Sequence, residues 1–536
     1  MKLASQYSCP VIMSGNPCGR PIHKSTDDPL PVCVMHSIDQ SKPGAQFNNE
    51  IKAIIAGTSK YGVANNFYDF SRFVFPIVDF SETTFQKKLE FAGAVFTSHA
   101  HFERSSFAKD ADFTRCEFRA SAVFSASTFK GKLTMKSAMF HGEAQFDQVL
   151  FSQDVDFTSA VFSSKAAFST TAFHKKAVFF GTLFKEDAFF AFCKFYDESE
   201  FGASQFNGDA NFQTSRFTKS VTYFSATFSQ RVDFSSMVVG RYVEPGMLPT
   251  SGDAQAAFAT VDLSNVVFQQ PNHVNFFGIN SASLDGLSIR LANCSGIEQV
   301  RFEEVRWKRL GRRIVLQDEL DITSDLRQPD RSHDLVASTY KKLIRNFDSW
   351  RQYDLSEDCF CGAMEMKRLA PNHFALGRFR RVEEFYRKHT WARKFGESFS
   401  VVNLYRVLNH YGSSYLRAIM VLVLFVCLFT IAYPFLGLCM KDSRTSVTGT
   451  ASTSAINTDD CATNAFYWGA AGHNYRDYVK VVGAGLWVTL DVATFQKKPT
   501  VEPASKWGRR LASLELVIIP GQAALFLLAV RRRFRR

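Results

Sequence analysis

Residues 111–129 read ADFTRCEFRASAVFSASTF, and phenylalanine recurs in this stretch at alternating steps of five and six residues. The same register runs from Phe80 to Phe234, where 28 of its 29 positions are aromatic and Met135 is the exception. The residue two before each aromatic is nearly always small or β-branched, as Cys116 is. A short repeat that is kept this strictly is typical of a solenoid, in which each unit buries its apolar side only against its neighbours.

Helices and simple strands do not fit this register. A helical face recurs every three or four residues, and a strand alternates every two. A coil with a short flat side every five or six residues does fit, with one large and one small side chain pointing inward from each side. Cys116 and Cys193 fall at the inward small positions, and we interpret them as packing residues.

The pattern resembles the pentapeptide-repeat family, in the variant where phenylalanine takes the central position usually filled by leucine. The resemblance covers about residues 65–305 and implies a β-solenoid, specifically a right-handed, four-sided β-helix. A coil with four such sides would take 22 residues, so Phe80 to Phe234 would make seven coils. Stacked strands at about 4.8 Å would then give a rod of about 34 Å.

The repeat becomes less regular after Phe234. Residues 240–253 carry glycine and proline turn signals and indicate a loop inserted between coils. Leucine-type repeats follow at 261–268 and 275–297. We expect the coil to end near Phe302 and Trp307, closed by the basic run Arg306, Lys308, Arg309, Arg312 and Arg313.

The net charge of +12 is not spread evenly along the 536 residues. Between Phe75 and Ser236 there are 17 Lys/Arg and 18 Asp/Glu residues, so the repeat region is close to neutral. Some pentapeptide-repeat proteins resemble DNA and inhibit topoisomerases through an acidic surface. The balanced charge makes a DNA-mimic inhibitor the weakest alternative function, and we expect no nucleic-acid partner.

Two apolar segments near the C-terminal end predict transmembrane helices. Residues 418–438 contain no charge, and residues 511–530 contain only Glu515 as a charged residue; each is long enough to cross a membrane. Basic residues precede the first segment and RRRFRR follows the second, which predicts that both termini are cytoplasmic and that residues 439–510 lie outside. The start of the chain has no apolar signal region. An interfacial helix is the alternative for the second segment.

The predicted outer loop holds Cys439 and Cys461. The compartment would permit a disulfide between them, and free thiols are the alternative.

Residues 481–496 (VVGAGLWVTLDVATFQ) lie between the two predicted spans, where two-span channels place a pore helix and a filter. The potassium-filter sequence is absent, and Lys497 and Lys498 would repel cations. A pore of other selectivity remains one hypothesis, and a helix that only packs the spans is the other. Ionisable groups in a membrane are costly and often functional. The candidate pore-lining residues are Thr489, Asp491, Thr494, Glu515 and Gln522.

The N-terminal segment combines Cys9, Cys18, Cys33 and His36 with many prolines and glycines and little apolar material. Three thiols and an imidazole suit tetrahedral zinc, and all four positions would be filled by protein, so we predict a structural site. Reduced cysteines in a disordered tail are the alternative. The zinc would fold a cap over the open edge of the β-helix, which otherwise invites strand pairing. Residues 44–56 predict a short helix leading into the first coil.

Residues 332–412 change to helical periodicity and predict two or three helices that lead to the membrane. Residues 403–412 (NLYRVLNHYG) predict an amphipathic helix at its surface. We interpret Cys359 and Cys361 as buried thiols. We interpret four acidic residues as helix-surface charge: Asp318, Glu319, Glu357 and Glu365. No phosphate loop, nucleophile elbow or metal-hydrolase signature is present in the sequence, so we expect no enzyme.

Nearly the whole chain resembles bacterial pentapeptide-repeat membrane proteins with a C-terminal two-span, ion-channel-like module. This predicts a cap over 1–60, a β-helix over 65–305, a helical linker over 306–415 and a two-span module over 416–536. The resemblance implies the bacterial inner membrane. Two functions compete: a homo-oligomeric pore gated from the cytoplasm, and a membrane-anchored scaffold whose β-helix binds a cytoplasmic protein without conduction.

Overall fold

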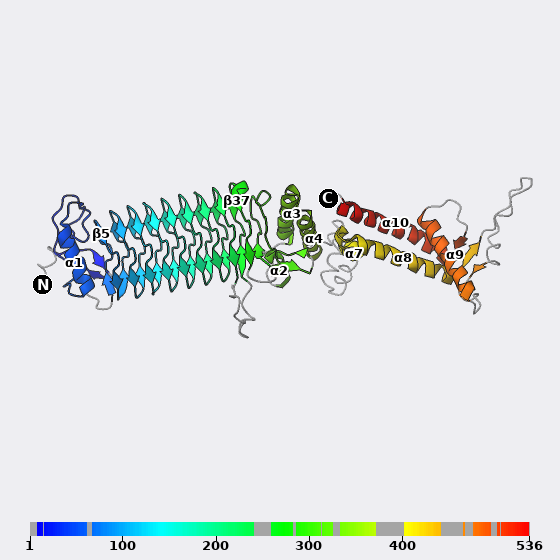
Figure 1. The fold of residues 1–536 in the computed structure, drawn as a ribbon, viewed down its shortest axis with the longest axis horizontal. Helices are drawn as coiled ribbons and strands as arrows, with labels where there is room; N and C mark the ends of the chain where they lie inside the picture. The colour runs from blue at the N-terminus through cyan, green and yellow to red at the C-terminus, as the bar shows by residue number, and fades with distance from the viewer. Residues whose placement is uncertain are drawn as a thin grey trace, which may run out of the picture. The chain divides into compact units, whose positions relative to one another are not determined.

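The computed structural model describes residues 8–13, 15–61, 67–240, 259–281, 286–311, 313–324, 333–370, 401–440, 465–466, 475–494, 501–503 and 505–534. The chain divides into two compact units, Met1–Met366 and Lys367–Arg536. The first unit contains the repeat region and both of its ends (Figure 1). The second contains the apolar helices.

Four parallel sheets form the sides of a β-solenoid in the first unit (Figure 1). One coil consists of β11 (Ala111–Asp112), β12 (Glu117–Phe118), β13 (Ala122–Val123) and β14 (Thr128–Phe129). Phe129 pairs with Phe107 of β10 (Ser106–Phe107), 22 residues earlier. The predicted four-sided coil of 22 residues is therefore confirmed.

The strands of each sheet follow one another along the solenoid axis, ten in one sheet and nine in each of the other three. The ten-stranded sheet runs from β3 (Phe67–Asp69) to β39 (Ser288–Arg290). The other three run from β4 (Val74–Phe75) to β36 (Val267–Phe268), from β5 (Val78–Asp79) to β37 (Val274–Asn275), and from β6 (Thr84–Phe85) to β38 (Asn280–Ser281).

The aromatic ladder is the core. No ladder aromatic between Phe80 and Phe234 is more than 3% exposed in this described stretch. Rings of successive coils stack, as Phe102 and Phe124 do with centroids 4.7 Å apart and planes at 2°. Burial of each phenylalanine contributes roughly 1.5–3 kcal/mol as an upper estimate, so the repeat itself stabilises the solenoid.

The small inward residues also have a hydrogen-bonding role. The Cys116 thiol donates to the carbonyl of Phe91 at 3.0 Å, and the Cys193 thiol donates to Phe168 at 2.9 Å. The Ser105 hydroxyl makes the equivalent bond to Phe80. These cysteines are buried packing residues, as predicted.

Helices from the same unit close the C-terminal end of the solenoid: α2 (Gln317–Ser324), α3 (His333–Ser349) and α4 (Tyr353–Leu369). The Asn346 side chain of α3 donates to the carbonyls of Ile297 and Val300 at 2.9 and 2.6 Å. Phe347 packs edge-on against Trp307. Helix α3 therefore supplies contacts at this end in addition to the basic run that the sequence predicts there.

The prediction that Asp318 and Glu319 are surface charges was wrong, because α2 packs against β39 and buries them to 1% and 2% exposure. The Asp318 carboxylate accepts from the Leu291 backbone N–H at 2.7 Å. Glu319 pairs with Arg313 and accepts from the Tyr340 hydroxyl at 2.6 Å. Both carboxylates therefore belong to the cap.

The second unit begins with α7 (Val401–Asn409), η5 (His410–Gly412) and α8 (Tyr415–Leu436). A small sheet of β42 (Leu438–Met440), β43 (Ala465–Phe466) and β44 (Val501–Pro503) follows α8. Helix α9 (Tyr475–Ala493) packs on α8 and on α10 (Lys506–Phe534). In α8 and α10, Tyr415–Leu436 and Lys506–Arg531 are long and apolar enough to cross a membrane, and they contain most of the predicted spans.

Candidate metal centre

A short hairpin brings together Cys9 and Cys18, which eight residues separate in the sequence. Its strands are β1 (Ile12–Met13) and β2 (Asn16–Pro17), which pair antiparallel. The Cys9 N–H donates to the Arg20 carbonyl, and the Cys18 N–H donates to the Val11 carbonyl, each at 2.8 Å. The hairpin explains how a pair spaced more widely than in a zinc knuckle can serve one site.

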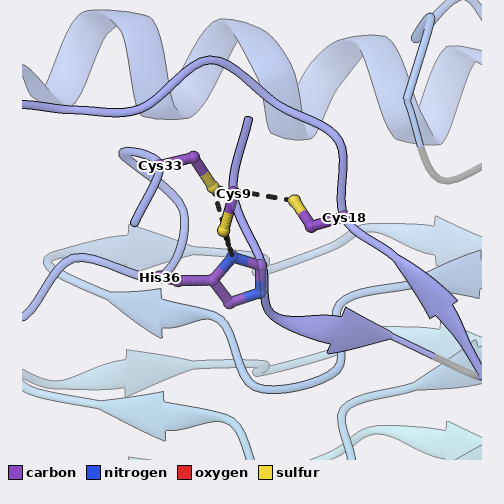
Figure 2. Close-up of side chains that lie close together, drawn as sticks. All are labelled: Cys9, Cys18, Cys33 and His36. Atoms are coloured by element: carbon purple, nitrogen blue, oxygen red, sulfur yellow. Dashed lines mark hydrogen bonds between the residues drawn. The ribbon is translucent and has the colours of Figure 1, made fainter. Parts of the chain in front are cut away.

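A tight turn supplies the other two side chains. The backbone N–H of His36 donates to the carbonyl of Cys33 at 2.9 Å, and the N–H of Ser37 donates to the same carbonyl at 3.0 Å. This turn points the thiol and the imidazole toward the hairpin, as Figure 2 shows.

The four predicted ligands form one buried cluster (Figure 2). Their Sγ and ring-nitrogen atoms all lie within 4.8 Å of one another. Cys18 Sγ lies 3.7 Å from Cys33 Sγ, and His36 Nδ1 lies 3.4 Å from Cys9 Sγ and 3.2 Å from Cys33 Sγ.

These separations fit a tetrahedral metal. Zinc bonds of about 2.3 Å to sulfur and about 2.0 Å to nitrogen place two sulfurs about 3.8 Å apart and a sulfur and a nitrogen about 3.5 Å apart. The donor set of three thiols and one imidazole is compatible with zinc. Four protein ligands would leave no open position, so the arrangement suits a structural site and not a catalytic one.

Arg20 is a partner of the cluster that the sequence did not reveal. Its Nη1 donates to Cys18 Sγ at 3.3 Å, and its Nη2 pairs with Glu50 of α1 (Gly44–Ala56) at 2.9 Å. The guanidinium also lies over the Phe73 ring. Three thiolates around a divalent cation would carry one net negative charge, and Arg20 would offset it while linking the cluster to α1.

The thiols do not share their protons equally. Hydrogen bonds from the Cys33 and Cys9 thiols hold the pKa of Cys18 well below its ordinary value, and Arg20 lowers it further. The same contacts with Cys18 and Cys9 raise the pKa of Cys33. The pKa of Cys9 is lowered as well, so the cluster favours thiolates, which attract a cation.

The turn that holds Cys33 and His36 contacts the first coil directly. The carbonyl of Met35 accepts from the Val74 N–H at 2.8 Å, and the buried ammonium of Lys42 donates to the carbonyls of Ser37 and Val74. Val74 belongs to β4, the terminal strand of its sheet. The His36 ring packs edge-on against Phe73, and His36 Nε2 has no hydrogen-bond partner among the described residues. The cluster therefore closes a sheet edge.

The candidate pore-lining residues lie in the second unit. Thr489, Asp491, Glu515 and Gln522 are at most 4% exposed, whereas Thr494 is exposed at the end of α9. Glu515 accepts from the Tyr433 hydroxyl, and the Gln522 side chain donates to the Ala418 carbonyl at 3.0 Å. Their role in a pore stays a prediction.

The predicted disulfide falls outside what the structure describes, because Cys461 lies beyond the described residues and only the backbone is described at Cys439. Residues 495–500, which include Lys497 and Lys498, also lie outside the described residues.

Comparison of the chain with family models, curated proteins and solved structures gives no match. The fold and the side chains themselves therefore indicate the class of protein. They define a β-solenoid with a Cys3His cluster at one end and a separate unit with two candidate membrane helices.

Proposed function

We propose that this chain is a non-enzymatic, pentapeptide-repeat scaffold of a bacterial inner membrane, held by two spans with both termini in the cytoplasm. A structural zinc bound by the Cys3His cluster would close the N-terminal edge of the solenoid. The sides of the solenoid would bind a cytoplasmic protein.

The closure of both solenoid ends by the chain itself is the observation that carries this proposal. Met35 covers the edge strand β4 at one end, and Asn346 covers the last turns at the other. These contacts oppose pairing with another chain at the backbone groups that they cover. The lateral faces are then the surface on which a partner can dock.

Exposed aromatic residues gather on those faces. Phe192 is exposed beside β25 (Ala188–Phe189), on the side of the coil opposite β23 (Ala177–Val178). Phe180 is exposed beside β23, and Phe224 is exposed two coils later at the equivalent position. Gly202 lies between these two phenylalanines, and a Cβ there would approach the Phe180 ring to 3.2 Å. Exposed aromatic groups are enriched where proteins bind one another, so we assign the partner surface to Phe180 and Phe224.

Photo-crosslinking in the full chain tests this assignment. We expect benzoylphenylalanine in place of Phe224 to give one discrete protein adduct in cells. Lys136 occupies the same corner of the solenoid four coils earlier, and the same probe there should give none. Equal labelling from both positions, or none from Phe180 and Phe224, would contradict a partner on this surface.

A two-span oligomeric pore is the second candidate. Its support is that Thr489 Oγ1, Glu515 Oε1 and Gln522 Oε1 are buried without hydrogen-bond partners among the described residues, and polar groups inside a membrane are often functional. These groups are buried within a single chain, however, whereas a pore between subunits needs them on a surface. This favours the scaffold.

Ion flux from liposomes that hold the purified full chain separates the two candidates. The scaffold predicts no flux above that of protein-free vesicles. Flux that Glu515→Ala or Asp491→Ala abolishes would establish the pore instead, and flux that neither substitution changes would show a pore with another lining.

A further inference from the structure

Helix α7 presents an apolar face that no described part of the chain covers. Leu404 and Val407 are three residues apart, so they share a face of the helix, and they are 52% and 51% exposed. Arg406 is exposed beside them. The level of this helix relative to the two spans indicates what covers the apolar face.

A side-chain hydrogen bond fixes the register of the spans. The Gln522 side chain of α10 donates to the Ala418 carbonyl of α8 at 3.0 Å, so these residues lie at the same level of two helices that run side by side (Figure 1). From that level α10 continues to Phe534, about 18 Å at 1.5 Å per residue, whereas α8 extends back only to Tyr415, about 5 Å.

The apolar part of α10 defines the thickness of the hydrocarbon layer. Residues 511–530 carry Trp507 and Arg510 before them and Arg531 after them. They are about 30 Å long, which equals a typical hydrocarbon core. On this scale Ala418 lies about 12 Å inside the layer from the Arg531 end, and α8 begins about 8 Å inside it.

Helix α7 and η5 occupy the level between the start of α8 and Arg531. Both contact α10, and α7 lies beside its C-terminal turns (Figure 1). His410, Tyr411 and Gly412 all have left-handed backbone angles, with φ of 52°, 60° and 82°. Consecutive left-handed residues interrupt a right-handed helix, so α7 turns away from the axis of α8 and does not extend the span.

The apolar surface of α10 continues at this level. Leu527 and Leu528 are 63% and 53% exposed, and they lie between the Gln522 level and Arg531 on α10. Leu404 and Val407 of α7 are thus exposed at a level where α10 also exposes apolar side chains.

We propose that α7 lies in the plane of the membrane on the Arg531 side, with Leu404 and Val407 among the acyl chains of that leaflet. This inference rests on the two spans of the proposed function. An in-plane amphipathic helix buries its apolar face about 5–10 Å into the boundary between headgroups and chains, which agrees with the roughly 8 Å between the start of α8 and the edge of the layer. Arg406 and Arg417 extend toward the headgroups, and anionic lipid strengthens this contact.

Depth-dependent fluorescence quenching by brominated lipids tests the inference. A fluorescent, environment-sensitive amino acid replaces Leu404 in the full chain, which is reconstituted in vesicles of phosphatidylcholine and phosphatidylglycerol. Met420, exposed on α8 near the middle of the layer, is the control for a span, and Ile77, exposed on the solenoid, is the control for water. The same probe at Val407 guards against misfolding caused by a single replacement.

We expect bromines near the glycerol end of the acyl chains to quench the probe at positions 404 and 407 most strongly. Bromines near the chain middle should quench position 420 most strongly, and position 77 should stay unquenched. Quenching at 420 with none at 404 or 407 overturns the placement of α7 and leaves the membrane anchor intact. No quenching at 420 overturns the anchor itself.

Discussion

Tyr223 carries the one hydroxyl group of the aromatic ladder. The side chain is fully buried, and its oxygen has no hydrogen-bond partner among the described residues. A buried polar group without a partner costs about 1–3 kcal/mol, so Tyr223→Phe should raise the free energy of unfolding by about that amount. Thermal unfolding of the full chain in detergent, followed by circular dichroism, measures the change.

The reverse substitution, Phe201→Tyr, is a matched control because Phe201 stacks on Tyr223 in the preceding coil. It should lower the unfolding temperature. An unchanged or lower unfolding temperature for Tyr223→Phe would show that the Tyr223 hydroxyl has a hydrogen-bond partner in solution.

Asp318 should make stability depend on pH. Burial raises its pKa from 3.8 to about 6, although the Leu291 N–H partly opposes the shift. A carboxyl group whose pKa is higher in the folded than in the unfolded protein makes its full contribution to stability below the pKa of the unfolded state. It loses that contribution as the pH rises through the pKa of the folded state. From about pH 4 to about pH 8, the wild type should lose roughly 3 kcal/mol relative to Asp318→Asn.

Urea unfolding of both proteins at several pH values measures this difference. Parallel pH profiles for the two proteins would mean that Asp318 is not the group responsible.

Residue chemistry determined how much of the metal site the sequence could predict. Cysteine and histidine identify themselves by the ligand atoms that they carry, so Cys9, Cys18, Cys33 and His36 could be predicted. Arg20 could not, because an arginine two residues after Cys18 has no distinctive sequence signal. Its role depends on Glu50 and Phe73, which reach it only in the folded chain.

We expect the N-terminal cap to depend on a zinc ion bound by the Cys3His cluster. Cys33→Ser removes one of four ligands, so we expect the bound zinc to fall from one per chain to almost none. Amide hydrogen exchange should then become faster in residues 67–90, because the cap that covers β4 loses its cross-link. Elemental analysis and exchange mass spectrometry measure these two effects.

Cys116→Ser is the matched control, because serine makes the same inward hydrogen bond at Ser105. It should keep its zinc and its slow exchange. A Cys33→Ser protein that retains full zinc would contradict the ligand assignment.

The packing of α9 on α8 should depend on one glycine. A Cβ at Gly485 would lie 2.4 Å from the Thr430 carbonyl oxygen, whereas a Cβ at Gly483 would meet nothing within 4 Å. Gly485→Ala should destabilise the second unit by about 1–3 kcal/mol. Gly483→Ala should be neutral or stabilising by up to about 1 kcal/mol, because alanine favours helix.

Thermal inactivation in detergent, read as loss of the monodisperse peak, compares the two variants. Equal behaviour of both would mean that the helices do not pack at Gly485 as described.

Elements with a local signal were predictable, and elements that depend on distant contacts were not. The coil repeats within 22 residues, so its period is visible in the sequence. The helix over 44–56 also agrees with α1. The cap formed by α2 and α3 was missed because Asp318, Glu319 and Asn346 look like ordinary polar helix residues. Only their contacts with Leu291, Arg313 and Ile297 show that they are buried.

The whole molecule contains a solenoid whose ends are closed and a unit that holds two apolar helices. Leu424 of α8 and Val517 of α10 are exposed on those helices, as lipid-facing residues would be. A lysine near the centre of a span costs about 2.5–3.5 kcal/mol on insertion scales. The anchor can therefore be weakened without touching the solenoid or the metal cluster.

Alkaline carbonate extraction of membranes from cells that make the full chain tests the membrane-anchored scaffold most directly. We expect the wild-type chain to stay in the membrane pellet and the double variant Leu424→Lys/Val517→Lys to be released while it keeps its zinc. Release of the wild-type chain into the supernatant would contradict the account.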